Sequence, residues 1–169
     1  CGGTQTLTWT FMDECDRVIS HVQTITTLPA PEPAFINPPA DVTLTCEEAQ
    51  NFVVTNLNYT NNVGGACEIS GSVLGVLSGN FDACGGEQTI TWTFTDECNR
   101  SITHTQTITI EPAPQAAFIN PPADVTLTCE EAAAFTASEL AYTNGVSGGC
   151  EISGSVTADV EGDFNPCGG

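Results

Sequence analysis

Lysine is absent from this sequence of 169 residues, and Arg17 and Arg100 are its only arginines. With 21 acidic residues, the formal net charge is −19. A surface of this charge repels nucleic acid and anionic lipid, so the sequence predicts no nucleic-acid partner. No apolar run approaches the ~20 residues that a membrane-spanning helix needs. We therefore expect no membrane insertion in this segment.

Motifs for catalysis are also missing. The sequence has no nucleophile motif, no phosphate-binding loop and no zinc-ligand spacing, and its acidic residues are scattered over turns. Paired carboxylates for glycoside hydrolysis would need a defined separation across a groove. His21 and His104 share one repeat position on an apolar strand face, which favours a structural histidine. The sequence thus predicts that this protein is not an enzyme.

Cysteine is abundant, and its spacing shows an internal repeat. Cys1, Cys15, Cys46, Cys67 and Cys84 recur 83 positions later as Cys84, Cys98, Cys129, Cys150 and Cys167. Residues 34–49 return unchanged as residues 117–132, and about two thirds of all aligned residues are identical. Nine cysteines at fixed spacing, without a close CxxC pair, indicate a disulfide framework and a secreted protein. We expect the odd count to arise because some partners lie in neighbouring repeats outside this sequence.

Alternating apolar and polar residues predict β-strands. Ile90, Trp92 and Phe94 share one face of a segment with a period of two, which favours a core tryptophan over a sugar-binding platform. The turn at residues 96–100 leads into a second alternating strand at residues 101–110, so the two form a hairpin. Further strands are predicted at residues 41–46, 52–59, 68–73 and 76–81, with one helical turn at residues 47–50. Six or seven short strands per repeat predict an all-β fold with one β-sandwich per repeat.

Proline-rich segments at residues 28–33 and 111–114 separate the repeats and favour short, stiff linkers. The predicted domains are therefore residues 1–33, the last hairpin of one repeat; residues 34–116, a complete repeat; and residues 117–169, the first part of the next. No signal peptide is present, and we expect export and anchoring signals to lie outside these residues.

The repeat resembles the HYR-type immunoglobulin-like repeat of very large adhesins from bacteria that use type IX secretion. The residues that carry the resemblance are Pro39–Cys46, Thr91–Asn99 and Thr105–Ile110. Asn99-Arg100 departs from the Gly-Asn turn of many family members. The resemblance implies an immunoglobulin-like sandwich and a role in adhesion rather than chemistry. The filament of the extracellular grappling hooks of predatory filamentous bacteria is the analogue it suggests.

Strand geometry restricts the disulfide pairing. Cys84 and Cys98 flank one strand of about nine residues, so they lie ~30 Å apart and cannot bond within one domain. If strands alternate in direction, Cys46 and Cys84 share one pole of the sandwich, and Cys67 and Cys98 share the other. The predicted bonds are Cys46–Cys84, Cys67–Cys98 and Cys129–Cys167, two per repeat, while Cys1, Cys15 and Cys150 are expected to have partners outside the sequence. Pairing of Cys46 with Cys67, and a link between chains, remain open.

Acidic residues near the two poles are candidate calcium ligands. Calcium takes six to eight oxygen ligands, and an acidic cluster between domains would stiffen an array. The candidates are Asp96 and Glu97 at one pole, and Glu47, Glu48, Asp82 and Glu111 at the other. Because no DxDxDG loop is present, a solvated acidic surface is the alternative.

Near-identical copies in series suit mechanical reach better than catalysis. The leading hypothesis is a structural shaft of an extracellular adhesive fibre or giant surface adhesin. Its partners would be copies of the same repeat, and other parts of the protein would bind a glycan or protein target on a cell surface. The alternative is an array of carbohydrate- or protein-binding modules, and a third hypothesis is an enzyme that carries these repeats as an appendage.

Overall fold

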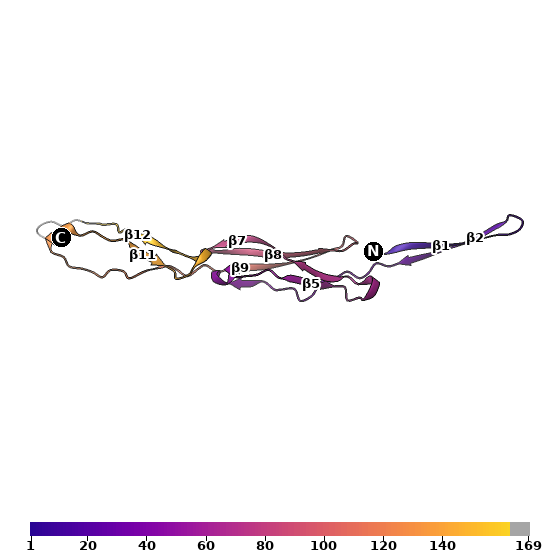
Figure 1. Ribbon diagram of the computed structural model, residues 1–169, viewed down its shortest axis with the longest axis horizontal. Helices are drawn as coiled ribbons and strands as arrows, with labels where there is room; N and C mark the ends of the chain where they lie inside the picture. The colour runs from indigo at the N-terminus through magenta and orange to yellow at the C-terminus, as the bar shows by residue number, and fades with distance from the viewer. Residues whose placement is uncertain (163–169) are drawn as a thin grey trace. The chain divides into compact units, whose positions relative to one another are not determined.

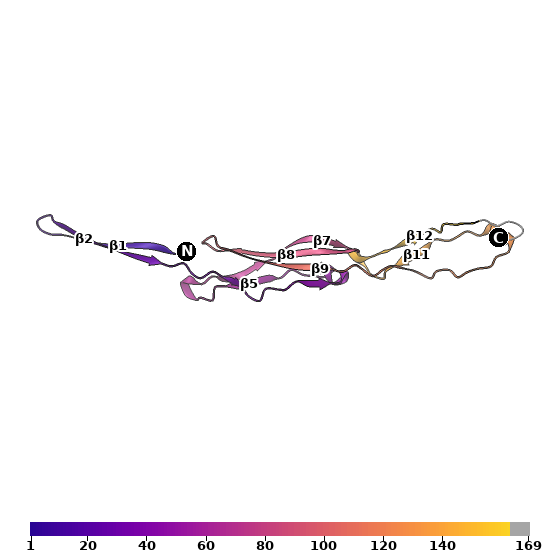
Figure 2. The same cartoon turned by 180° about the vertical axis from the view of Figure 1, so that it is seen from behind.

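The computed structural model describes residues 1–162, and most of its regular elements are β-strands (Figures 1 and 2). The strands are β1 (Gly3–Met12), β2 (Val18–Thr27), β3 (Ala34–Phe35), β4 (Val42–Leu44), β5 (Asn56–Thr60), β6 (Ser70–Leu74), β7 (Val76–Asp82), β8 (Gly85–Thr95), β9 (Ser101–Ile110), β10 (Ala117–Phe118), β11 (Leu140–Thr143) and β12 (Ser153–Val156). The helices are α1 (Cys46–Gln50), α2 (Cys129–Ala134) and the 3₁₀ turns η1 (Gly65–Cys67) and η2 (Gly148–Cys150). The prediction of a mostly β fold is confirmed. None of the helices in the described part is long and apolar enough to cross a membrane.

The strands are arranged in separate small sheets. β1 and β2 pair only with each other, as a two-stranded antiparallel hairpin. The complete repeat contributes the sheets β3-β5-β6 and β4-β9-β8-β7, in which β4 runs parallel to β9. The next repeat contributes the sheet β10-β11-β12. Because β3 and β4 lie at sheet edges, the Asn37-Pro38-Pro39 segment between them removes no central hydrogen bond from a sheet.

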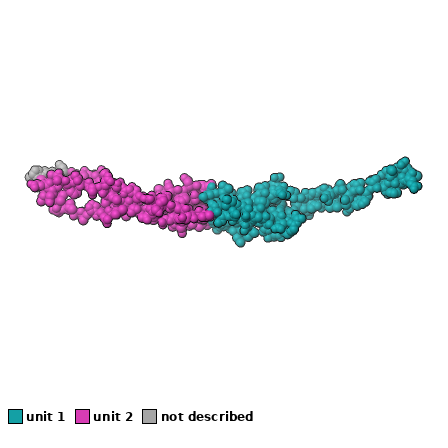
Figure 3. Space-filling view, viewed as in Figure 1, with its two compact units in different colours: residues 1–40, 54–77, 89–106 teal, residues 41–53, 78–88, 107–169 magenta. Residues whose placement is uncertain are grey.

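The chain divides into two compact units, coloured separately in Figure 3. Unit 1 contains residues 1–40, 54–77 and 89–106, and unit 2 contains residues 41–53, 78–88 and those from 107 onward. Each unit combines residues from two consecutive repeats, so neither coincides with one repeat. The domain boundaries drawn from the sequence therefore stay a prediction.

The core of unit 1 lies between the β3-β5-β6 sheet and the β8-β9 hairpin. Trp92 is 2% exposed, and its indole Nε1 donates to the carbonyl of Thr55 at 3.0 Å. Phe94 stacks on Tyr59 with ring centroids 3.8 Å apart. Ile90 is buried on the same face, as the period of two requires. The prediction of a core tryptophan is confirmed.

The core of unit 2 includes the parallel pair β4-β9 and helix α1, which contacts β4. Ile108 and Ile110 are buried, and burial of an isoleucine side chain contributes about 1.5 to 3 kcal/mol. Helix α1 begins with the buried Cys46. Its start is fixed by a capping box, in which Thr45 accepts from the Glu48 N–H and Glu48 accepts from the Thr45 N–H.

Strand boundaries differ from the prediction mainly in the first half of the complete repeat. The segment predicted as a strand at residues 52–59 forms a strand only from Asn56 onward. The residues before Asn56 are not part of this strand, and the Thr55 carbonyl accepts a hydrogen bond from the Trp92 side chain rather than from a neighbouring strand. The predicted hairpin and helical turn are confirmed as β8-β9 and α1.

Candidate functional site

Two disulfides each join cysteines of consecutive repeats. Cys1 bonds Cys98 with a Cα–Cα distance of 5.2 Å, and Cys46 bonds Cys150 with a Cα–Cα distance of 5.9 Å. The partners are 97 and 104 residues apart in the sequence, so each bond spans more than one repeat of 83 residues. The first bond lies in unit 1 and the second in unit 2. The junctions between repeats are therefore the candidate functional sites.

The predicted pairing within a repeat is wrong. Cys46 does not bond Cys84 or Cys67, and Cys98 does not bond Cys67. The predicted sharing of poles agrees with the units, because Cys46 and Cys84 belong to unit 2, and Cys67 and Cys98 belong to unit 1. The error has a physical cause. Each unit also receives a cysteine from the adjacent repeat, and that cysteine is the actual partner.

Two further cysteine predictions are wrong, since Cys1 and Cys150 have their partners inside the chain. The exposed cysteines without a disulfide in the described part are Cys15, Cys67, Cys84 and Cys129. The predicted bond of Cys129 to Cys167 involves a cysteine that lies outside the described residues. Disulfides persist in oxidising compartments, so the two bonds indicate an oxidising, extracellular environment.

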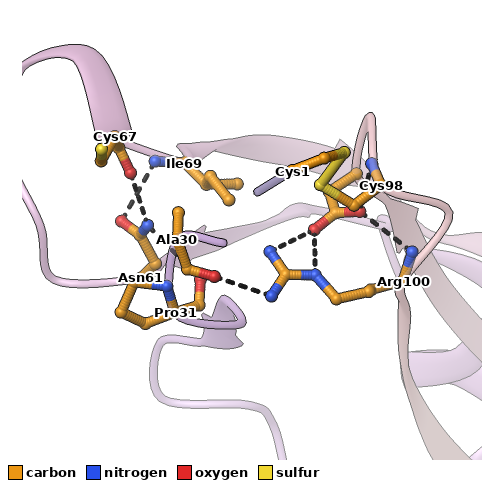
Figure 4. A network of polar contacts seen from close by, with 9 residues as sticks. Cys1, Ala30, Pro31, Asn61, Cys67, Ile69, Cys98 and Arg100 are labelled. Atoms are coloured by element: carbon orange, nitrogen blue, oxygen red, sulfur yellow. Dashed lines mark hydrogen bonds and ion pairs between the residues drawn. A yellow bond between two sulfur atoms is a disulfide. The ribbon is translucent and has the colours of Figure 1, made fainter. Parts of the chain in front are cut away.

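Arg100 connects the turn of the β8-β9 hairpin to the linker that precedes the repeat (Figure 4). Its Nη2 lies 2.6 Å from Oδ2 of Asp96, and its Nη1 donates to the carbonyl of Ala30 at 2.8 Å. The Asp96 side chain is only 3% exposed. Arg100 thus forms an ion pair within its own turn and also fixes the linker.

Asp96 stays ionised in this turn at neutral pH. Burial raises the pKa of Asp96, but hydrogen bonds from the Arg100 backbone N–H, the Arg100 side chain and the Cys98 N–H outweigh burial. The pKa of Asp96 therefore lies below its ordinary value. The same bonds close the hairpin, since the Cys98 N–H donates to Asp96 Oδ1 at 2.8 Å beside the disulfide.

Asn61 shapes the loop that carries Cys67 (Figure 4). Its Nδ2 donates to the Cys67 carbonyl at 2.8 Å, and its Oδ1 accepts from the N–H groups of Ile69 and Val63 at 3.0 and 3.2 Å. Nδ2 also reaches the carbonyl of Pro31, in the preceding linker, at 3.5 Å. A side chain that is 6% exposed thus holds the cysteine loop near the junction.

The junction in unit 2 uses an equivalent loop. Asn144 donates to the Cys150 carbonyl at 2.8 Å, just as Asn61 donates to the Cys67 carbonyl in the preceding repeat. Gln50 extends from α1 to this loop, where its Oε1 accepts from the Gly149 N–H at 3.0 Å and its Nε2 donates to the Ser147 carbonyl at 3.3 Å. The disulfide that starts at α1 is therefore supported by hydrogen bonds on both sides.

Glycine follows the cysteine in the Cys-Gly-Gly segments because a second strand approaches closely. Gly85 has φ +87°, and a Cβ there would lie 2.5 Å from the carbonyl oxygen of Ile110. A Cβ at Gly2 would lie 2.5 Å from the carbonyl oxygen of Thr27, which is the equivalent contact one repeat earlier. A side chain at either position would push the cysteine-bearing strand away from its neighbour.

The predicted calcium ligands do not form a common site in the described part. These residues were Asp96, Glu97, Glu47, Glu48, Asp82 and Glu111. Asp96, Glu48 and Asp82 hydrogen-bond to groups of their own turns instead. No group of three or more His, Cys, Asp or Glu side chains that could hold a metal ion occurs among residues 1–162.

Three residues that form junction contacts were not predicted from the sequence. The repeat of Asn61 as Asn144 could have indicated a structural role for this asparagine. No sequence feature indicates the hydrogen bond of Arg100 to the linker, since nothing in the spacing places a linker carbonyl beside the turn. The sequence argues against a role for Gln50, because alanine replaces it in the next copy.

Comparisons with protein-family models, curated proteins and solved structures find no match.

Proposed function

We propose that this chain is a segment of the shaft of an extracellular adhesive fibre or giant surface protein, built from immunoglobulin-like sandwich repeats and without enzymatic activity. The observation that carries the proposal is that both disulfides join consecutive repeats. A bond inside a repeat stabilises that repeat alone. A bond between repeats transmits tension across the junction, which is what a shaft requires.

The two disulfides also overlap along the sequence. One closes residues 1–98 and the other closes residues 46–150, so segments 1–46, 46–98 and 98–150 all connect the same two bonds. Tension between the bonds is thus shared by three covalent segments in parallel. The shortest one, residues 1–46, sets the greatest possible extension.

Charge and composition support the same function. The net charge of −19 keeps a protein of many repeats soluble and would keep neighbouring shafts apart. The buried position of Trp92 removes it as an exposed platform for sugar binding. The disulfides favour a secreted protein at the cell surface.

Single-molecule pulling between the chain ends tests the proposal. In the oxidised protein the unfolded path from Cys1 to Cys150 should follow residues 1–46 and cross the Cys46–Cys150 bond. Reduction should lengthen this path by the 104 residues between Cys46 and Cys150, or about 340 to 370 Å. The matched control is C46S/C150S, in which the path runs through the Cys1–Cys98 bond and residues 98–150.

Equal lengths for the oxidised and reduced chains would contradict a shaft stapled between repeats. Specific capture of glycans by the isolated chain would support the alternative, an array of binding modules.

A further inference from the structure

The complete repeat has one side on which both of its sheets end in an uncovered strand. β6 is the last strand of the β3-β5-β6 sheet, and β7 is the last strand of the β4-β9-β8-β7 sheet, within the described residues. Gly75 is the single residue between these two strands, so the chain passes directly from one sheet edge to the other. We call residues 70–77, which all belong to unit 1, the open edge.

The packing of Gly75 determines which side chains of the open edge point outward. A Cβ on Gly75 would lie 2.3 Å from Cγ2 of the buried Ile90, so this position faces the core. Because side chains alternate along a strand, Leu74 and Val76 point away from the core. They are 64% and 68% exposed, and Leu77 is 43% exposed. The open edge therefore combines a strand edge that no other described strand covers with exposed apolar side chains.

An edge strand of this kind is a template for pairing with another strand, and natural proteins protect such strands with charges, proline or a β-bulge. None of residues 69–81 is charged or a proline. Gly79, further along β7, has φ +86°, which is typical of a β-bulge. A bulge there limits strand pairing to the residues that precede it, and those residues include the exposed Leu74 and Val76.

The next repeat carries charges where the complete repeat has none. Between residues 34–86 and their equivalents 117–169, four acidic residues are gained. Three of the four replace alternate residues of β7, at Asp159, Glu161 and Asp163. The residues just before them, 68–73 and 151–156, are identical in the two repeats. The gain of charge is thus concentrated on the one strand edge that would otherwise accept a partner.

Backbone chemistry and charge together identify the partner as a second copy of this edge. An uncovered strand edge accepts another strand, and an uncharged edge offers a basic or acidic peptide no ion pair. The net charge of −19 opposes the approach of two copies at their acidic surfaces, so contact is left to the uncharged edge. The acidic residues of the next repeat would repel a second chain, which restricts pairing to the complete repeat.

We propose that two copies of this chain associate through their open edges, with β7 of one copy antiparallel to β7 of the other. A two-fold axis near Val76 places this residue beside its counterpart, where two β-branched side chains pack well. The exposed Leu74 and Leu77 flank this contact in each copy. The proposal goes beyond the shaft function, because a shaft transmits tension along a single chain and needs no lateral contact.

V76D is the main test, because it gives the open edge the residue that the next repeat carries as Asp159. In a two-fold pair the change places two carboxylates opposite each other, so we expect association to weaken about ten-fold or more. Val76 is 68% exposed, so V76D should keep the melting temperature of the parent chain. V76T keeps a β-branched, uncharged side chain and should associate nearly like the parent.

V53D is the matched control for the added charge. Val53 is 74% exposed, lies outside the open edge and receives the same substitution. Its association should equal that of the parent chain. Sedimentation equilibrium measures association after the free thiols have been blocked with iodoacetamide, so that no disulfide can link two copies.

Hydrogen exchange and salt locate the contact and define its chemistry. In the parent chain, the β7 amides that face away from β8 should exchange more slowly at high than at low protein concentration. In V76D this difference should disappear. Added salt should strengthen the association of the parent, because salt screens the repulsion between two acidic chains.

A parent chain that stays monomeric at millimolar concentration would overturn the proposal. So would an association that V76D and V53D weaken equally, or one that added salt weakens, because each result would place the contact elsewhere. None of these results affects the length change on reduction that tests the shaft, so the two proposals fail separately.

Discussion

The hairpins β1-β2 and β8-β9 have nearly the same sequence and the same local geometry, yet one is exposed and the other is buried. Trp9 stacks on His21 with centroids 5.7 Å apart, and Trp92 stacks on His104 at 5.8 Å. Their exposures are nevertheless 52% and 2% for the two tryptophans.

The turns of the two hairpins show the same contrast. Arg17 and Arg100 each lie 2.6 Å from the aspartate four residues earlier. The arginine side chains are 80% and 26% exposed, because within residues 1–162 only Arg100 has a linker carbonyl beside it. The hairpin sequence therefore determines local geometry, whereas burial depends on the sheet and linker of the rest of the repeat.

The largest difference between the hairpins is expected at the cysteine of each turn. C1S/C98S removes a disulfide that closes a loop of about 100 residues, so it should lower the free energy of unfolding by roughly 4 kcal/mol. C15S removes the equivalent cysteine of the exposed hairpin, which has no disulfide in the described part. It should change the free energy of unfolding by less than about 0.5 kcal/mol. Urea unfolding of dilute protein measures both. If C1S/C98S lowered the free energy of unfolding as little as C15S is expected to, the Cys1–Cys98 bond would not support the fold.

Replacing the two tryptophans by alanine should change the free energy of unfolding by amounts that differ nearly as much. W92A leaves a cavity and an unpaired Thr55 carbonyl, and should cost about 3 to 5 kcal/mol of unfolding free energy. W9A should cost less than about 1 kcal/mol in the monomer, since Trp9 is half exposed. Each variant keeps one tryptophan, so emission maxima provide a check. The tryptophan left in W9A should emit at shorter wavelength than the one left in W92A, and identical maxima would contradict the contrast in burial.

The smallest expected effect is the acid sensitivity of the two turns. The pKa of Asp96 is lower in the folded chain than its ordinary value of about 3.9. The unfolded chain therefore takes up the proton first, so this contribution is present above pH 4 and is lost as the pH falls through the folded pKa. Melting temperatures of the parent chain and D96N should converge below that pH. D13N is the control, and a larger effect of D13N would contradict the importance of the buried turn.

Period-two segments allowed the β8-β9 hairpin and its buried face to be predicted, because these features depend on neighbouring residues. The identical segments 42–44 and 125–127 show where sequence pattern stops being sufficient. Residues 42–44 form β4 beside β9, whereas residues 125–127 form no strand. The described chain contains no third β9-like strand for them to pair with, and no local sequence difference distinguishes the two segments.

The disulfide pairing failed for a related reason. The direction and length of the predicted strands correctly placed Cys46 and Cys84 at one pole and Cys67 and Cys98 at the other. These properties describe a single repeat, however, and do not include cysteines of the adjacent repeat. Whether a cysteine meets its own repeat or the next depends on how closely the repeats approach. Arg100 and Gln50 form hydrogen bonds to residues of the adjacent repeat or linker, and the spacing of residues in the sequence predicts neither contact.

The overlap of the two disulfide loops also fixes an order of events in time. Cys1 has no partner until Cys98 has emerged, and Cys46 has none until Cys150 has emerged. A chain exported from its N-terminus would therefore keep its most recent repeat in the thiol form while older repeats become oxidised. Oxidation should follow export at a lag of about one repeat, so the growing end remains reducible and correctable while the rest is fixed.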